Sequence, residues 1–142
     1  MPATAGLPDS GFQVAWVAVK HPDPLIAGGT APFEVSFTNK SDKVWPDVPT
    51  SADPKTGAGS VRLSYRIRKA GSGEVLRDYV NRADLKSPLN PGATATLSFD
   101  VELPKEPGRY EIQFDLVQEF VAWFESKGAA PSVTDIEVVA PR

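Results

Sequence analysis

The feature that most constrains the fold is a strictly alternating stretch of apolar and polar residues late in the chain. After a Pro107-Gly108 turn, four apolar residues alternate with polar ones: Tyr110, Ile112, Phe114 and Leu116. A period of two places every second side chain on the same face of a β-strand. We expect this strand to lie at the centre of the fold, with its apolar face in the core.

Similar apolar runs, mostly alternating, recur along the chain, separated by turn residues. The expected strands cover residues 12–19, 33–38, 61–68, 74–80, 94–103 and 132–139. Fourteen prolines and eleven glycines are spread between these runs, and such residues punctuate strands and turns rather than helix interiors. Roughly seven or eight short strands predict an all-β fold: an immunoglobulin/fibronectin-like β-sandwich of two antiparallel sheets.

Several local features refine this prediction. Residues 12–19 are apolar on both faces, so we expect this strand to be covered on both sides. The turn Gly71-Ser-Gly73 predicts that residues 61–68 and 74–80 form an antiparallel hairpin. Residues 120–126 fit a helical turn nearly as well as an extended segment, and we expect a short extended or irregular piece there. Residues 47–60 form a long polar loop, which is typical of functional or disordered segments.

Composition limits the organisation and the partners. A length of 142 residues predicts one sandwich domain over residues 12–142, preceded by a flexible segment at 1–11. The absence of cysteine favours a cytoplasmic location. Fifteen Lys and Arg against eighteen Asp and Glu give a net charge of −3, which argues against nucleic acid as a partner. No apolar run approaches the roughly 20 residues of a membrane helix, so we expect a soluble chain without membrane insertion.

The residues give little support for catalysis or for a cofactor. His21 is the single histidine, and no nucleophile or phosphate-binding motif accompanies it. No spacing of carboxylates resembles a metal loop, so we expect no metal, no cofactor and no catalytic residue. Asp115 and Glu119 could do acid–base work as a pair, but we expect ordinary sheet-surface and loop residues. The chain is therefore predicted not to be an enzyme.

Tyr110 has a structural interpretation. A tyrosine at the start of a late strand, directly after a Pro-Gly turn, is typical of the tyrosine corner, in which its hydroxyl bonds to the backbone of the preceding turn. We expect Ile112 and Val35 to fill the positions where antibody domains place their disulfide.

Aromatic residues outside the alternating pattern are the candidate ligand contacts: Trp45, Tyr79, Trp123 and Phe124. Tryptophan and tyrosine present flat apolar faces that stack on sugar rings or fill partner pockets. The alternative is that such residues cap the core at the end of a sandwich. Arg66 joins the candidates from a basic stripe that also holds Arg62, Arg68 and Lys69. The stripe could attract an anionic glycan, phosphate or acidic partner, or it could pair across strands with Glu111 and Asp115.

Several segments taken together resemble a known family: Phe33-x-Val-x-Phe-Thr-Asn39, Val44-Trp-Pro46, Leu89-Asn-Pro-Gly92, Pro107-Gly-x-Tyr110, Phe114-Asp-Leu-Val-Gln-Glu119 and Trp123-Phe124 with Gly128. In this order they resemble the immunoglobulin-like accessory domain of bacterial surface-polysaccharide glycosyltransferases and methyltransferases. The middle segments are also similar to the carbohydrate-binding domain of polysaccharide-transporter ATPases. The spacing from Asn39 to Trp45-Pro46 and the segment Pro107-Gly-x-Tyr110 are also similar to the four-tryptophan interaction domain of autophagy receptors.

This resemblance implies a non-catalytic module rather than an enzyme. Its expected partner is a bacterial surface glycan, recognised for an attached or neighbouring polysaccharide-synthesis enzyme such as a glycosyltransferase. The alternative that we keep open is a protein-interaction or structural docking domain that binds no glycan.

Overall fold

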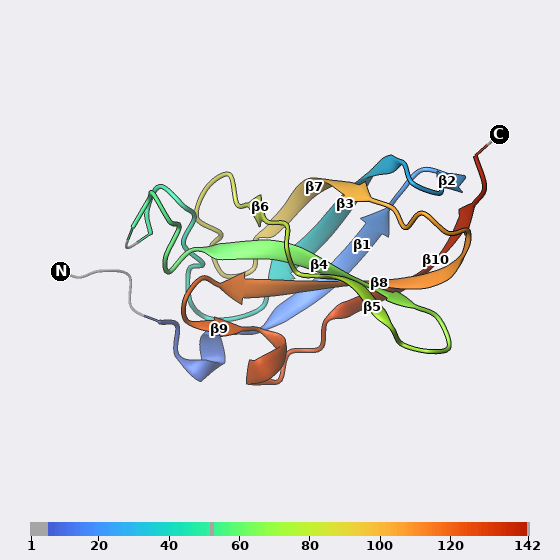
Figure 1. Ribbon diagram of the computed structural model, residues 1–142. Helices are drawn as coiled ribbons and strands as arrows, with labels where there is room; N and C mark the ends of the chain where they lie inside the picture. The colour runs from blue at the N-terminus through green and yellow to red at the C-terminus, as the bar shows by residue number, and fades with distance from the viewer. Residues whose placement is uncertain (1–5, 52, 142) are drawn as a thin grey trace.

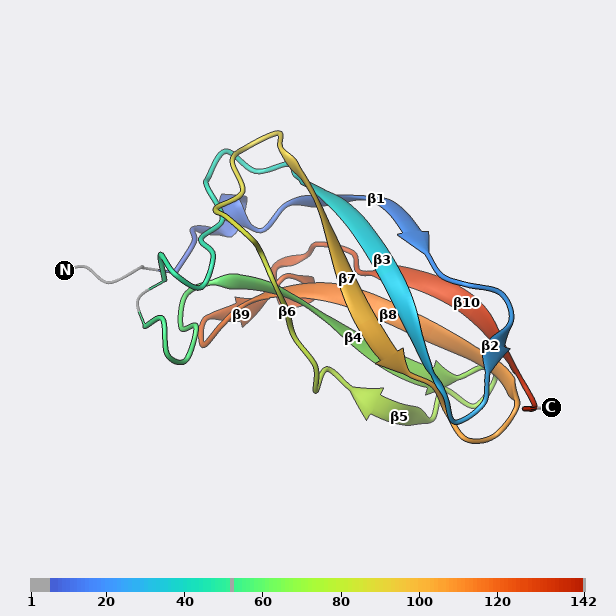
Figure 2. The same cartoon turned by 90° about the horizontal axis from the view of Figure 1, so that it is seen from above.

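Two β-sheets pack face to face in the computed structural model, which describes residues 6–51 and 53–141 (Figures 1 and 2). The smaller sheet has the order β1-β3-β7, with β1 at Val14–Lys20, β3 at Thr30–Asn39 and β7 at Thr94–Glu102. The larger sheet has the order β2-β10-β8-β4-β5, and its strands are β2 (Leu25–Ile26), β10 (Ser132–Val139), β8 (Gly108–Gln118), β4 (Val61–Lys69) and β5 (Val75–Asp78).

Two short strands and two 3₁₀ turns complete the fold. The strand β6 (Ala83–Asp84) pairs with β4, and β9 (Ala122–Trp123) pairs with β8. The 3₁₀ turns are η1 (Asp9–Gly11) and η2 (Glu125–Lys127). All strand pairs are antiparallel except β10 with β2. The predicted all-β sandwich is therefore confirmed.

The alternating stretch predicted to be central is β8, the middle strand of the larger sheet. It lies between β10 and β4, with Phe114 opposite Tyr65 of β4 and opposite Ser132 of β10. The predicted hairpin is also present, since β4 and β5 pair antiparallel around the turn at 71–73. Val35 of β3 and Ile112 of β8 are both fully buried, one in each sheet, and that they fill the disulfide positions of antibody domains stays a prediction.

Aromatic rings fill the space between the sheets. The Phe114 ring lies 6.1 Å from that of Phe33 and 6.4 Å from that of Phe99, measured between centroids. Tyr65 meets Phe99 edge-on at 5.2 Å. Such tilted and edge-on contacts add to the burial of apolar area that holds the two sheets together.

The tyrosine corner is confirmed. The Tyr110 hydroxyl donates a hydrogen bond of 2.6 Å to the carbonyl of Glu106, in the turn that precedes β8. The ring itself is buried, so this bond satisfies a polar group at the edge of the core.

Two predictions about the start of the chain are wrong. The first strand is not covered on both sides, because none of the residues of β1 is fully buried and Val17 is 59% exposed at a register shift opposite β3. Residues 6–11 are not a loose segment, because the Leu7 N–H donates to Gln118 Oε1 (2.8 Å) and Gly11 is buried. Residues 1–5 of the predicted flexible segment lie outside the described residues.

The described parts of the 47–60 loop are folded by their own hydrogen bonds. Asp47 accepts a bond from the Thr50 N–H at 3.1 Å, and the Ser60 hydroxyl donates to the Gly57 carbonyl at 2.7 Å. Gly57 has a left-handed backbone, and a β-carbon there would collide with the Arg62 guanidinium at 2.5 Å. Among residues 6–51 and 53–141, no helix is long and apolar enough to cross a bilayer.

Candidate functional site

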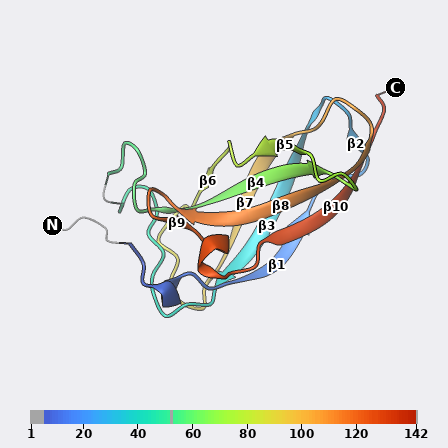
Figure 3. The ribbon, with the colours of Figure 1, turned by 60° about the horizontal axis from the view of Figure 1, so that its bottom comes forward.

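The outer face of β8 is covered at its C-terminal end, which alternation alone does not predict. After β8 the chain reverses at Phe120, and β9 pairs back onto β8 with Trp123 opposite Val117 (Figure 3). Phe124 then enters the core, where its ring meets those of Phe12 and Trp45 edge-on. Side chains of β8 that alternation places outside are nevertheless buried, Asp115 among them, and the Glu125 N–H of η2 bonds to the Asp115 carboxylate. The expected irregular piece at 120–126 is a short strand followed by the η2 turn.

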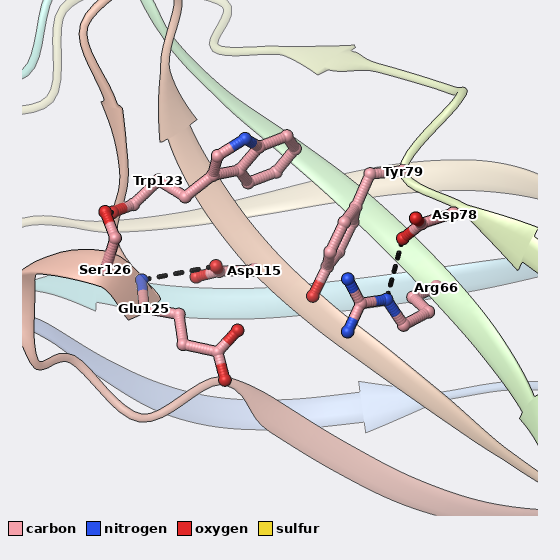
Figure 4. Close-up of a pocket in the computed structure, with 7 residues that line it drawn as sticks. All are labelled: Arg66, Asp78, Tyr79, Asp115, Trp123, Glu125 and Ser126. Carbon is pink, nitrogen blue, oxygen red and sulfur yellow. Dashed lines mark hydrogen bonds and ion pairs between the residues drawn. The ribbon is translucent and has the colours of Figure 1, made fainter. Parts of the chain in front are cut away.

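Beside this cover, two aromatic rings and two guanidinium groups form a stack. The rings of Tyr79 and Trp123 lie 4.5 Å apart at an angle of 33°. The Arg66 guanidinium lies 4.6 Å from the centre of the Tyr79 ring, and that of Arg82 lies 5.1 Å from the Trp123 ring. In Figure 4 Tyr79 stands between Trp123 and Arg66. Cation–π contacts of this kind attract each guanidinium group to the face of the ring it covers.

Further polar contacts fix the members of this stack. Gln113 of β8 donates from Nε2 to the Tyr79 hydroxyl at 2.6 Å. Arg66 of β4 donates from Nε to Asp78 Oδ1 at 2.7 Å. The Tyr79 backbone is left-handed, with φ of 58°, a conformation that non-glycine residues adopt at a cost. Such strain gathers at functional sites, where the surrounding contacts hold it.

Tyr79, Trp123 and Arg66 of this stack line a hollow of about 570 Å³ on the outer face of the larger sheet (Figure 4). Its lining residues are Arg66, Asp78, Tyr79, Asp115, Trp123, Glu125 and Ser126. Trp123, Asp115, Glu125 and Ser126 lie on one side of the view, and Tyr79, Asp78 and Arg66 on the other.

Asp115 is the buried acid of this hollow, with only 1% of its surface exposed. Its Oδ1 accepts the Leu116 N–H at 2.8 Å, and its Oδ2 accepts the Glu125 N–H at 3.3 Å. Desolvation raises the pKa of Asp115 to about 7, and the nearby Glu125 carboxylate adds to the rise. The two backbone N–H donors and Arg66 oppose it. Burial also raises the pKa of Tyr79, against the lowering effect of the Gln113 bond.

The structure brings together three of the predicted ligand residues and separates two others. Tyr79, Trp123 and Arg66 line the same hollow. Trp45 and Phe124 are both fully buried, so the prediction that they contact a ligand is wrong. The Trp45 indole donates to the Gly11 carbonyl at 2.9 Å, which satisfies its one polar atom inside the core.

The expectation that Asp115 and Glu119 are ordinary surface residues is also wrong. Asp115 is buried in the hollow, and Glu119 is buried against Arg82 and Arg62. Glu125 and Asp78 are further lining residues that the sequence did not single out. The apolar run at Phe120–Phe124 was the available signal, because such a run directly after a strand can fold back to cover it.

The basic stripe on β4 pairs with acids, as one of the two interpretations predicts. Arg68 pairs with Glu111 of β8 at 3.2 Å. Arg66 pairs with Asp78 of β5 rather than with Asp115, which faces Ser64 in the register of β4 and β8. Among the described residues, no group of three His, Cys, Asp or Glu side chains is placed to hold a metal ion.

Comparison with known proteins identifies the fold. No protein-family model and no curated protein matches the sequence. Among solved structures, the CARDB domain of the PF1109 protein from Pyrococcus furiosus, in complex with di-metal ions, is similar at a TM-score of 0.52 and 17% identity. That match covers 89% of this chain and 84% of the CARDB chain.

Two larger proteins also contain a similar region. The alkylpurine DNA glycosylase AlkC of Pseudomonas fluorescens, bound to DNA containing an abasic site analog, matches at a TM-score of 0.54 and 12% identity, over 89% of this chain and 30% of that one. A mutant β-glucosidase of Listeria innocua in complex with laminaribiose matches at a TM-score of 0.51 and 14% identity, over 89% of this chain and 16% of that one. At such identities these likenesses show the fold alone, an immunoglobulin-like β-sandwich.

Proposed function

We propose that this chain is a non-catalytic binding module that holds part of a bacterial surface glycan in the hollow beside β8. The observation that carries the proposal is the convergence of Tyr79, Trp123 and Arg66 on one concave surface. These residues were selected from the sequence for aromatic character or charge, and they come from separate segments of the chain. The resemblance to accessory domains of polysaccharide-synthesis enzymes supports the same interpretation.

The chemistry of the hollow suits a saccharide. Its volume of about 570 Å³ falls within the roughly 300–1,000 Å³ typical of small-ligand sites. Trp123 is half-buried, and the part of its ring that Tyr79 and Arg82 leave uncovered supplies apolar surface against which sugar C–H groups can pack. The carboxylates of Asp115 and Glu125 accept hydrogen bonds from hydroxyl groups, and Arg66 donates them. A few fixed polar groups on an aromatic wall are what a specific small-ligand site needs.

The partner in this proposal is an enzyme of polysaccharide synthesis, attached to or beside the module. The module itself is proposed to do no chemistry, since the hollow contains no assembled nucleophile, base and orienting group. Asp115 acts in this proposal as a hydrogen-bonding group rather than as an acid catalyst.

A glycan array followed by calorimetry tests the proposal. The purified chain is screened against bacterial surface oligosaccharides, and the strongest one is titrated into wild type and into Trp123→Ala. We expect the variant to bind at least about 2 kcal/mol more weakly, because an aromatic anchor of the site is lost. Trp16→Ala is the control, since Trp16 lies on β1 of the other sheet and its indole donates to Ala130. Equal affinity of wild type and Trp123→Ala, or no binding on the array, contradicts the proposal.

A second candidate function, docking to a protein partner, has one specific observation in its favour. Phe120 forms the tip of the β8–β9 hairpin with 79% of its surface exposed, next to the exposed Val121. Its backbone is left-handed, with φ of 62°, so the chain keeps an exposed phenylalanine where glycine would be less strained. A co-purification with the neighbouring synthesis enzyme that is lost in Phe120→Gly, without binding on the glycan array, would favour this candidate.

A further inference from the structure

Two carboxylates in the hollow, those of Asp115 and Glu125, lack the cationic partner that several other acids on this sheet have. Asp78 pairs with Arg66, Asp84 with Arg62 and Glu111 with Arg68. Within the described residues, no ion pair joins Asp115 or Glu125 to a lysine, arginine or histidine within 4.0 Å. Both carboxylates nevertheless line the same concave surface.

The charge of the hollow follows from these pairings. Arg66 is the one cation of its lining, and its charge is matched by Asp78 at 2.7 Å. Asp115 and Glu125, on the Trp123 side of the hollow in Figure 4, are left in excess. An acidic sugar such as a uronic acid would therefore meet like charge, whereas a cationic group would meet opposite charge at short range.

Of the two carboxylates, the buried one of Asp115 has the greater need for hydrogen-bond donors or a counter-charge. A buried carboxylate needs a counter-charge or several hydrogen bonds, and Asp115 receives only two backbone N–H bonds, one of them 3.3 Å long. A carboxylate offers about four lone-pair positions, so Asp115 can accept further donors. A ligand ammonium provides up to three N–H donors together with the missing positive charge.

We propose that the hollow selects a saccharide that carries a free primary amino group, whose ammonium lies between Asp115 and Glu125. This inference rests on the proposed function, since it specifies which class of sugar the glycan site accepts. Trp123 packs against the sugar ring, and the ammonium takes the place of the ion-pair partner that the protein does not supply.

The protonation of Asp115 gives an independent signature. Arg66 on β4, Tyr79 after β5 and Glu125 on η2 are the charged or titratable groups that influence it. Since its pKa is raised to about 7, an appreciable fraction of Asp115 is protonated in the free protein at neutral pH. A bound ammonium lowers this pKa, so binding releases protons, and the measured enthalpy depends on the ionisation enthalpy of the buffer.

The test uses paired oligosaccharides of glucosamine, galactosamine and mannosamine, each as the free amine and as its N-acetylated form. We expect at least one free amine to bind about tenfold or more tightly than its N-acetylated counterpart at pH 7, with proton release. Asp115→Asn and Glu125→Gln should each reduce this preference severalfold. Glu34→Gln is the matched control, because Glu34 is an exposed acid of β3 on the other sheet and its loss likewise removes one carboxylate.

The possible failures are distinct. N-acetylated or acidic oligosaccharides that bind as tightly as the amines, with Trp123→Ala still weakening them, overturn the amino-sugar inference and leave the glycan site intact. A preference for amines that Glu34→Gln reduces as much as Asp115→Asn shows general charge attraction and overturns the inference too. Absence of binding by every oligosaccharide, including those of the wider array, overturns both proposals.

Discussion

At the scale of single residues, burial decides which polar groups affect stability. Tyr110 is a buried residue whose hydroxyl stabilises the fold. Its hydroxyl donates a hydrogen bond to the Glu106 carbonyl. Tyr110→Phe keeps the ring and removes this donor, leaving a carbonyl short of a partner at the edge of the core. We expect the free energy of unfolding to fall by about 1–3 kcal/mol, measured by denaturant titration. Saccharide affinity should not change, and a loss of binding in this variant would show that the corner shapes the hollow.

Asp115 shows the opposite case, a buried acid that destabilises the fold when it ionises. The folded protein holds this proton up to a pH of about 7, whereas the unfolded chain releases it near the ordinary pKa of 3.8. Unfolding therefore releases a proton between these values, so a higher pH favours the unfolded state. The loss of stability from pH 4 to pH 7 attributable to this group is on the order of 3 kcal/mol.

Asp115→Asn tests this linkage, because the amide retains the acceptor for the Leu116 N–H but cannot ionise. Wild type should lose stability as the pH rises from 4 to 7, whereas the variant should not lose this contribution. We therefore expect the unfolding free energy of the variant, minus that of wild type, to increase with pH. Urea titrations at several pH values measure this difference. Parallel pH profiles for the two proteins would mean that Asp115 titrates normally and is more hydrated than its burial indicates.

At the scale of elements, the sequence predicts the long strands well and the β8–β9 hairpin poorly. Strands such as β3, β7 and β10 alternate cleanly because one face meets the core and the other faces out. The hairpin gives no such signal, since β9 has two residues and the tight turn before it contains neither glycine nor proline. Without that hairpin, alternation alone places Asp115 on an exposed face.

Phe120 is the position in this hairpin where a substitution should improve stability. Glycine adopts a left-handed backbone without the steric cost that Phe120 bears, and the largely exposed ring gains little from burial. We expect Phe120→Gly to raise the unfolding free energy by about 0.5–1 kcal/mol, after allowance for the greater flexibility of glycine in the unfolded chain. A destabilisation of more than about 1 kcal/mol in chemical denaturation would contradict this account.

At the scale of the whole molecule, the site exists only because the fold joins distant segments. Arg66 comes from β4, Tyr79 follows β5, Asp115 lies on β8, and Trp123 and Glu125 follow the reversal of the chain. The sequence identifies candidate aromatic residues but does not tell which of them are in the core and which line a binding site. Trp45 and Trp123 both stand next to apolar residues and near loops, yet one closes the core and the other lines the hollow.

The three tryptophans make the central claim directly measurable. Their indole N–H groups occupy three different environments: Trp45 donates to Gly11 in the core, Trp16 donates to Ala130 beside β1, and Trp123 lines the hollow. An ¹H–¹⁵N spectrum of the labelled protein, titrated with the strongest oligosaccharide of the array, therefore reports the binding position. We predict that the Trp123 indole signal shifts with ligand concentration while those of Trp45 and Trp16 stay in place. A saturable shift at Trp16 or at the amides of Phe120 and Val121, with the Trp123 signal unmoved, would contradict a glycan site in the hollow.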